Sequence, residues 1–201
     1  MQDLAIFPLF YLPPVVYFSA LKTHGFEFLL EKNEHFPKQT FRNRASIASP
    51  NGILALTIPV VKGAKVHTPI KDVKISDTIK WQRLHWLSLE TCYRSSAYFE
   101  YYEADLVRFY EKKYTFLFDF NLELLNWLFD RLKIENEPNF TDTYSDYPEA
   151  LDYRNKFSKK EIYTEKTKPY FQVFSDRNPF LPNLSIVDLL FNQGPQSKSY
   201  F

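Results

Sequence analysis

The strongest constraint on the fold is a turn signal at Ser49-Pro50-Asn51-Gly52. Two runs rich in β-forming residues flank it, at 40–48 and 53–61. An Asn-Gly pair between two such runs is the strongest short-range signal for an antiparallel hairpin. Centring the turn on Asn-Gly sets Ile47 opposite Leu56, so that apolar side chains share one face. The sequence therefore predicts a β-hairpin here.

The first strand of this hairpin begins in an unneutralised basic stretch. Residues 35–71 contain six Lys and Arg and no carboxylate, whereas the formal net charge of the whole chain is only +1. Because side chains alternate faces on a strand, we expect Lys38, Arg42 and Arg44 on one side. Two arginines so placed, roughly 7 Å apart, suit a phosphate, a pyrophosphate or a pair of carboxylates. The alternative is a solvated face whose arginines pair with acids from the helices.

Before the hairpin, the sequence predicts a parallel crossover unit. Residues 4–12 are typical of a buried strand, in which Pro8 indicates a bulge or an edge. Pro13-Pro14 opens a helix, since proline is favourable in a first helical turn. Residues 26–32 form the next strand. A strand, a helix and a strand in this order are typical of a βαβ unit.

After the hairpin, a third strand is expected at 70–76, and the period then changes. Apolar residues recur every three or four positions, which is the spacing of a buried helical face. Three helices are predicted in this way, covering Trp81 to Cys92, Phe99 to Tyr110, and residues 120–133 with Asp119 or Asn121 as N-cap.

The last third of the chain is more polar. Residues 135–169 are rich in charges and prolines, and so long a segment without a helix or strand is typical of a functional lid or a disordered loop. A strand is expected at 170–174 and a helix at 183–195. Ser185 and Asp188 resemble the capping box of that helix.

These elements predict one α/β domain over residues 1–201, with α+β as the alternative. The expected architecture is a mixed sheet, built from an N-terminal strand-helix-strand unit and an antiparallel hairpin. Several helices from the C-terminal half pack against it. A chain of 201 residues with 45% hydrophobic residues is large enough to bury a core without staples.

Composition excludes several function classes. Only four glycines are present, and no glycine-rich phosphate loop occurs. The near-zero net charge argues against nucleic acid as a partner. A single cysteine, Cys92, is typical of a reducing compartment, so we expect a cytoplasmic protein. Residues 4–21 carry no charge, but three prolines interrupt them and no positive region precedes them, which argues against a membrane span or a signal peptide.

His85 is the main candidate for proton transfer. It lies in the same helical stripe as Trp81 and Leu89, where a lone histidine is more often a hydrogen-bonded core residue. Its unperturbed pKa near 6.5 still suits a general base. The other histidines have no metal-ligand spacing to it or to Cys92, so neither a metal site nor a cofactor is expected.

Seven segments of the chain agree with a known family pattern in order and spacing. They are "YLPPVVYF" (11–18), "HFPKQTFRNRASI" (35–47), "NGILALTIPV" (51–60), "IKDVKISD" (70–77), "HWLSLETCYRSSAYFEYY" (85–102), "FLFDFNLEL" (116–124) and "NLSIVDLLFNQGP" (183–195). The chain thus resembles the WbqC-like family. It departs from the family pattern at Pro8, where the first strand usually lacks a proline, and at Cys92, where alanine is common.

The resemblance implies a place in carbohydrate metabolism. Family members often lie in O-antigen or other surface-polysaccharide gene clusters, and transfer of glycine or another acyl group onto a sugar has been suggested for them. The motif positions imply His85 as the catalytic residue. They imply a ligand-binding set of Lys38, Arg42, Asn43, Arg44, Tyr11, Tyr17, Trp81 and Tyr93. The motif positions also include Pro13, Pro14, Asp188 and Asn192.

Two function classes stay open at this point. In the first, the protein is an aminoacyl or acyl transferase, in which Arg42, Arg44 and Lys38 hold the phosphates of a nucleotide-sugar. His85 then deprotonates the acceptor, and the polar segment closes as a lid. In the second, a non-catalytic protein recognises an anionic sugar, a nucleotide-sugar or a partner enzyme. Both classes imply a small ligand with a phosphate or carboxylate, and both leave the oligomeric state open.

Overall fold

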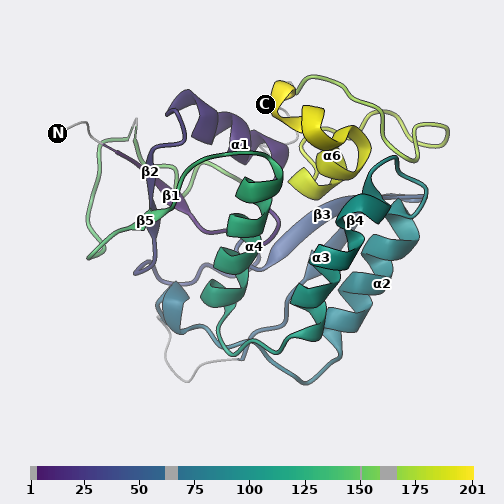
Figure 1. The fold of residues 1–201 in the computed structure, drawn as a ribbon. Coiled ribbons are helices and arrows are strands. Elements are labelled where there is room, and N and C mark those ends of the chain that lie inside the picture. Colours follow the sequence, from purple (N-terminus) through teal and green to yellow (C-terminus); the bar gives the residue numbers. More distant parts are fainter. Residues whose placement is uncertain (1–3, 62–67, 150, 159–166) are drawn as a thin grey trace.

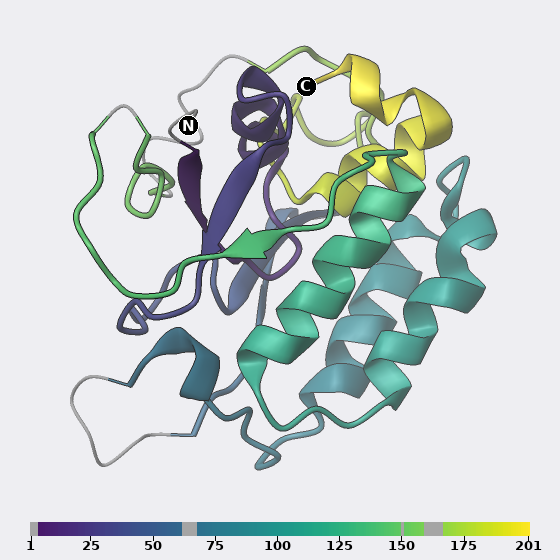
Figure 2. The same cartoon turned by 60° about the vertical axis from the view of Figure 1, so that its left-hand side comes forward.

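The computed structural model describes residues 4–61, 68–149, 151–158 and 167–201, and its elements form a mixed α/β architecture (Figure 1). Strands β1 (Ala5–Pro8) and β2 (Phe28–Glu31) pair in parallel, and helix α1 (Val15–Thr23) connects them. Strand β5 (Asn139–Phe140) pairs in parallel with the other side of β2. Figure 2 shows these strands side by side. The predicted crossover unit is confirmed.

The predicted hairpin is also present, but its expected register was wrong. Strands β3 (Arg44–Ser49) and β4 (Gly52–Thr57) are antiparallel, and Ile47 lies opposite Leu54 rather than Leu56. Pro50 and Asn51 occupy the two central turn positions, because Ser49 pairs with Gly52. Ser, Pro and Gly at the first, second and fourth positions are favoured in a type I turn. The proline therefore shifts the turn by one residue, and the pairing by two.

The basic stretch before β3 does not continue the strand. Residues 38–43 form turns, with Asn43 N donating to Thr40 O and Gln39 at a positive φ of 63°. Strand alternation therefore begins only at Arg44. The expectation that Lys38, Arg42 and Arg44 share one strand face was wrong, because a turning backbone does not alternate its side chains.

The predicted helices are confirmed with small shifts at their ends. They are α2 (Trp81–Tyr93), α3 (Phe99–Glu111), α4 (Leu117–Arg131) and α6 (Ile186–Gln193). Helix α4 begins earlier than expected, with Phe116 as its N-cap instead of Asp119 or Asn121. Asp119 lies in the first turn instead, where a negative charge interacts favourably with the helix dipole. Helices α2, α3 and α4 lie side by side (Figure 2).

Two expected strands are not strands. Residues 70–76 contain a 3₁₀ helix (Ile70–Asp72), followed by isolated bridges to other segments. Residues 170–172 have no regular structure, and a turn begins at Val173. There the Gln172 side chain donates to Leu181 O and accepts from Leu181 N, both at 2.9 Å. An amide side chain thus supplies the hydrogen bonds that a strand partner would have supplied.

The polar segment wraps around the parallel sheet. We call residues 139–149 and 151–158 the strap; residues 150 and 159–166 of the expected lid lie outside the described residues. The strap begins as β5 beside β2 and then returns to the opposite edge. There Ile6 N donates to Leu151 O at 2.7 Å and Tyr153 N donates to Ile6 O at 2.8 Å. The strap therefore covers both edges of the sheet.

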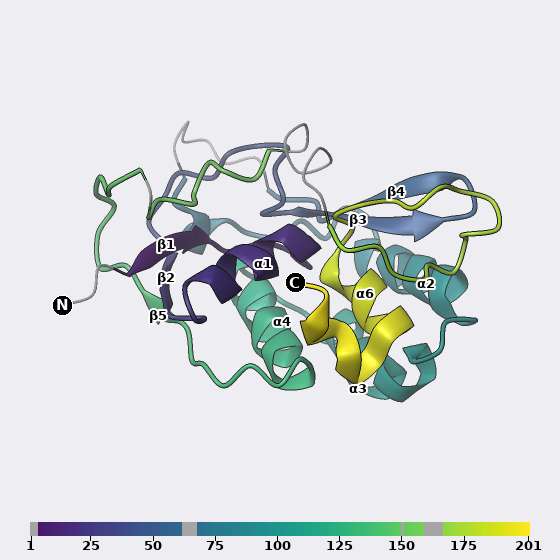
Figure 3. The same cartoon turned by 90° about the horizontal axis from the view of Figure 1, so that it is seen from above.

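The core is dominated by aromatic rings. Phe7 stacks on Tyr153 of the strap with centroids 4.3 Å apart, and meets Tyr17 edge to face at 5.4 Å. Seen from above, the parallel sheet and the hairpin lie at opposite sides of the molecule, and α4 lies between them (Figure 3). In the described parts of the chain, no helix combines the length and apolar character that crossing a membrane requires.

Candidate functional site

Arg42 forms a buried ion pair with Glu34. Its Nε and Nη2 donate to the two carboxylate oxygens at 2.6 Å each, and the residue is only 3% exposed. Nη2 also donates to the backbone oxygen of Arg154 in the strap, at 2.9 Å. The charge of Arg42 is thus balanced inside the protein. Its acid comes from the loop after β2, not from a helix as the alternative interpretation of the sequence had it.

A second buried guanidinium, Arg154, lies beside this pair. It forms ion pairs with Asp152 at 2.6 Å and with Glu31 at 3.4 Å. The Tyr144 ring lies over it, with the centroid 4.4 Å from Cζ. The cluster thus contains three carboxylates, from Glu31, Glu34 and Asp152, and two guanidinium groups, from Arg42 and Arg154. The cluster therefore has no surplus positive charge to offer an anion.

Burial and pairing act in opposite directions on the carboxylates of this cluster. Burial raises the pKa of Glu34 above its ordinary value, although the hydrogen bonds from Arg42 oppose the rise. Burial also disfavours the charged form of Asp152, but its hydrogen bonds with Arg154 outweigh this and hold its pKa below the ordinary value. Glu34 therefore gains a proton more readily than Asp152.

A pocket of about 220 Å³ opens next to this cluster. Its walls come from the loop after β2 and from the strap, and the lining residues are Asn33, Glu34, His35, Pro37, Tyr144, Arg154 and Asn155. The Asn33 amide joins the two walls, because Nδ2 donates to Thr141 O at 3.1 Å and to Asp142 O at 3.0 Å. The pocket thus combines fixed polar groups with the ring of Tyr144, a residue that is 55% exposed.

His85 lies in the core and not in this pocket. Its Nδ1 is 2.9 Å from the hydroxyl of Tyr11, which in turn is 2.9 Å from the hydroxyl of Tyr110. Burial lowers the pKa of His85 to about 4, against a smaller opposing effect of a hydrogen bond to the Thr57 backbone. The Trp81 ring packs against it at 5.2 Å. The imidazole is neutral near pH 7, and core residues surround it.

Tyr93 belongs to another buried network, centred on Asp188. The hydroxyls of Tyr93 and Tyr170 each donate to the Asp188 carboxylate at 2.7 Å, and Tyr93 also accepts from Ala48 N at 3.0 Å. Burial raises the pKa of Asp188 to about 6, although these hydrogen bonds oppose the rise. Ser185 does cap α6, accepting from Val187 N at 3.4 Å. The expected capping box was wrong in its second member, because Asp188 points into the core.

The remaining predicted ligand residues separate into two groups. Asn43 and Tyr17 hold the backbone, by donating to Ile58 O and to Pro8 O respectively, both at 2.9 Å. Lys38 is exposed and directly follows Pro37 of the pocket. Arg44 is half-buried, and its Nε has no hydrogen-bond partner. Among the described residues, neither Lys38 nor Arg44 has an acidic partner.

None of the seven residues that line the pocket was among the predicted site residues. Glu34 had one local signal, since it is the nearest acid before the basic stretch. The strap residues had none, because the contact of Arg42 with Arg154 spans 112 positions. In the described ranges, no group of three or more His, Cys, Asp or Glu is arranged to hold a metal ion.

Comparisons with known proteins agree with the motif pattern. The chain is 27% identical, over 227 aligned positions, to a Mycobacterium tuberculosis protein described as uncharacterized protein Rv1507c. The alignment covers 100% of this chain and 97% of that protein. No solved structure matches the chain. The model of the WbqC-like protein family matches residues 10–152 and 140–200, so the chain belongs to the WbqC-like protein family.

Proposed function

We propose that this protein binds a phosphate-bearing sugar, such as a nucleotide-sugar, in surface-polysaccharide precursor biosynthesis. The sugar ring occupies the pocket beside the Glu34–Arg42–Arg154 cluster. The observation that carries this proposal is the lining of the pocket, in which a carboxylate, a guanidinium and two amides surround one space. Such groups donate to and accept from hydroxyls, and an exposed tyrosine ring offers a face on which a sugar packs.

The size and charge of the pocket support a neutral ring rather than a phosphate inside it. A volume of about 220 Å³ is below the range of roughly 300–1,000 Å³ that is typical of drug-sized ligands, so it suits one small group. The guanidinium groups of the cluster are already paired with carboxylates. A phosphate is better served by Lys38 at the pocket edge, and we assign Arg44 to the same anionic part of the ligand.

The test is a thermal-shift and calorimetric comparison of glucose, glucose 1-phosphate, UDP-glucose and inorganic phosphate. A ligand that binds only the native state raises the melting temperature. We expect the phosphate-bearing sugars to do so. Lys38→Ala should weaken them by about tenfold, which is the loss of one charge-assisted hydrogen bond, and should leave any glucose binding unchanged.

Pocket variants separate this site from other surfaces. Tyr144→Ala and Asn155→Ala should abolish the shift, because both side chains line the pocket. Tyr101→Ala is the matched control, since Tyr101 is an exposed tyrosine on α3. Equal shifts in the wild type and both pocket variants would contradict the proposal.

Acyl transfer onto the bound sugar is a second candidate, and the raised pKa of Glu34 favours it. A carboxyl with a raised pKa that lines a pocket is suited to general acid–base catalysis. In this reaction a sugar hydroxyl or amine attacks an activated acyl donor, Glu34 accepts the proton, and the leaving group departs. Glu34 replaces His85 in the catalytic role, because His85 is enclosed in the core.

Mass spectrometry tests this second candidate. Incubation of UDP-N-acetylglucosamine with a glycyl thioester should give the glycylated sugar nucleotide in the presence of the wild-type protein. Glu34→Gln should stop product formation while the sugar nucleotide still binds. If the wild-type protein binds the sugar nucleotide and gives no product with a series of acyl thioesters, the binding function stands and the transferase does not.

A further inference from the structure

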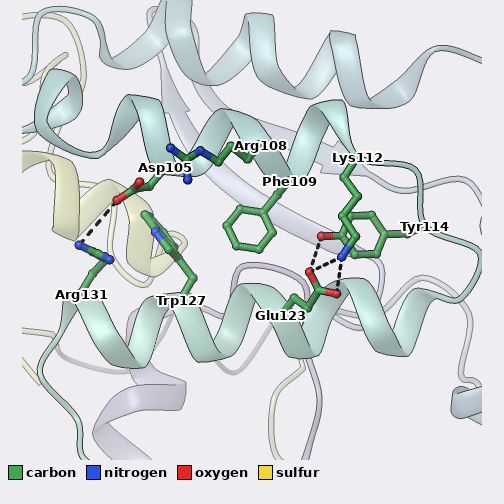
Figure 4. Close-up of a pocket in the computed structure, with 8 residues that line it drawn as sticks. All are labelled: Asp105, Arg108, Phe109, Lys112, Tyr114, Glu123, Trp127 and Arg131. Carbon is green, nitrogen blue, oxygen red and sulfur yellow. Dashed lines mark hydrogen bonds and ion pairs between the residues drawn. The ribbon is translucent and has the colours of Figure 1, made fainter.

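A second pocket lies between α3 and α4. Its volume is about 340 Å³, and its lining residues are Asp105, Arg108, Phe109, Lys112, Tyr114, Glu123, Trp127 and Arg131. Figure 4 shows these side chains between the two helices, with the rings of Phe109 and Trp127 in the middle of the groove. The two rings meet edge to face with centroids 6.2 Å apart. The groove therefore has an apolar centre between charged ends.

Two hydrogen-bond donors at one end of this groove are buried and unpaired. Trp127 is 8% exposed, and its indole Nε1 has no hydrogen-bond partner. Figure 4 shows this nitrogen on the side of the ring that faces Asp105 and Arg108. Arg131 lies one turn further along α4, and its Nε is also buried without a partner. Buried donors are nearly always satisfied in native proteins, so this pair lacks an acceptor.

The charges at the two ends of the groove differ. At one end, Lys112 donates to Glu123 at 2.7 Å, and the Tyr114 hydroxyl donates to Glu123 at the same distance. That end is internally balanced.

At the other end, Arg131 pairs with Asp130 at 2.8 Å and approaches Asp105 at 3.7 Å, whereas exposed Arg108 has no acidic partner among the described residues. The one lining arginine without an acidic partner in the described ranges, Arg108, thus lies at the same end as the unpaired donors.

We propose that this groove binds a small carboxylate attached to a flat apolar group. The carboxylate accepts from the indole of Trp127 and from Arg131 Nε, and Arg108 supplies its counter-charge. The apolar group packs on Phe109 and on the ring of Trp127. The volume is within the range of roughly 300–1,000 Å³ that is typical of small-molecule sites. This site is independent of the proposed sugar pocket, because the two share no lining residue.

The test uses benzoate as the probe and the indole N–H signal of Trp127 in a nitrogen-15 NMR spectrum. Trp127→Phe assigns this signal among the three tryptophans. Benzoate should shift it in a saturable way. Benzyl alcohol keeps the ring and acetate keeps the charge. Each should bind about tenfold more weakly than benzoate, because each lacks one of the two groups that the groove contacts.

Arginine variants test whether benzoate binds at this groove or to any exposed arginine. Arg108→Ala should weaken benzoate by about tenfold, since it removes the free cation. Arg83→Ala, at an exposed arginine of α2, is the matched control and should leave the affinity unchanged. The proposal is overturned if benzoate leaves the Trp127 signal in place. It is also overturned if acetate binds as well as benzoate, or if both arginine variants bind like the wild type.

Discussion

The Glu34–Arg42–Arg154 cluster and the Asp188 network bury charge in two different ways. In the first, guanidinium groups meet carboxylates directly, as in the 2.6 Å contacts of Arg42 with Glu34. In the second, a fully buried carboxylate receives neutral donors only, from Tyr93, Tyr170 and Gln172. The Arg42 guanidinium opposes the rise that burial causes in the pKa of Glu34, whereas Asp188 has neutral donors only and burial raises its pKa to about 6. The two regions should therefore respond differently to mutation and to pH.

The largest expected effect comes from removing one member of the ion pair. Arg42→Ala leaves Glu34 buried without its cation, which should cost about 3–5 kcal/mol of unfolding free energy. Urea unfolding followed by circular dichroism measures this. The double variant Glu34→Gln with Arg42→Met should recover most of the loss, because neither charge remains buried. A loss below about 1 kcal/mol in Arg42→Ala would show that water replaces the arginine.

Acid titration separates the Asp188 network from the cluster. The folded-state pKa of Asp188 is about 6, above its ordinary 3.8, so the folded protein binds the proton more tightly than the unfolded chain does. This stabilisation is fully present below pH 4 and is lost as the pH rises through about 6. This difference between the ordinary and the folded-state pKa of Asp188 corresponds to on the order of 3 kcal/mol of unfolding free energy.

Asp188→Asn should remove this pH dependence. His85 contributes with the opposite sign, because its pKa is lowered to about 4 and its stabilisation is lost as the pH falls from 6.5. That contribution is common to both proteins, so it cancels when the variant is compared with the wild type. Urea unfolding at pH 4, 5, 6 and 7 gives the comparison. A constant difference across this range would contradict the assignment to Asp188.

Removing one neutral donor should cost less than removing a cation. Tyr170→Phe deletes a hydroxyl that donates to Asp188 at 2.7 Å, and about 1–3 kcal/mol of unfolding free energy should be lost. The variant should also raise the pKa of Asp188 further, because one bond to the charged form is gone. Tyr101→Phe, at an exposed tyrosine, is the control and should change stability very little.

The smallest effect on stability is expected at the two cations outside both regions. Lys38→Ala and Arg44→Ala should each change the unfolding free energy by about 0.5 kcal/mol or less, because neither side chain has an acidic partner in the described ranges. Thermal and urea unfolding check this. A large loss in Arg44→Ala would place that residue in the structural framework and weaken its assignment to ligand binding.

The sequence predicted the parts of the fold that depend on neighbouring residues. The stripe from Trp81 to Cys92 identifies α2, because a buried helical face repeats at three and four positions. The hairpin was predicted, but its register depends on whether Pro50 or Asn51 starts the turn, and the Asn-Gly signal dominated.

The candidate site was less predictable. Arg42 lies on a turning backbone four positions after exposed Lys38, and its burial arises from contacts with Glu34 and the strap. The spacing of residues in the basic stretch does not indicate that Arg42 contacts Glu34 and the strap. The motif tyrosines were predicted as ligand residues, yet Tyr11, Tyr17 and Tyr93 are fully buried and their hydroxyls form hydrogen bonds within the core. Motif positions alone do not separate groups that hold the fold from groups that meet a ligand.

The strap has a consequence for the order in which the protein folds. Strands β1 and β2 are close in sequence, whereas the hydrogen bond of Thr141 with Glu31 spans 110 positions. Contacts between residues that are far apart in the sequence slow folding more than they reduce stability. In pulse-labelling hydrogen exchange, the amides of Thr141 and Tyr153 should therefore gain protection after those of β2. One wall of the sugar pocket belongs to the strap, so a nascent chain acquires this binding site only after the strap has closed against β1 and β2.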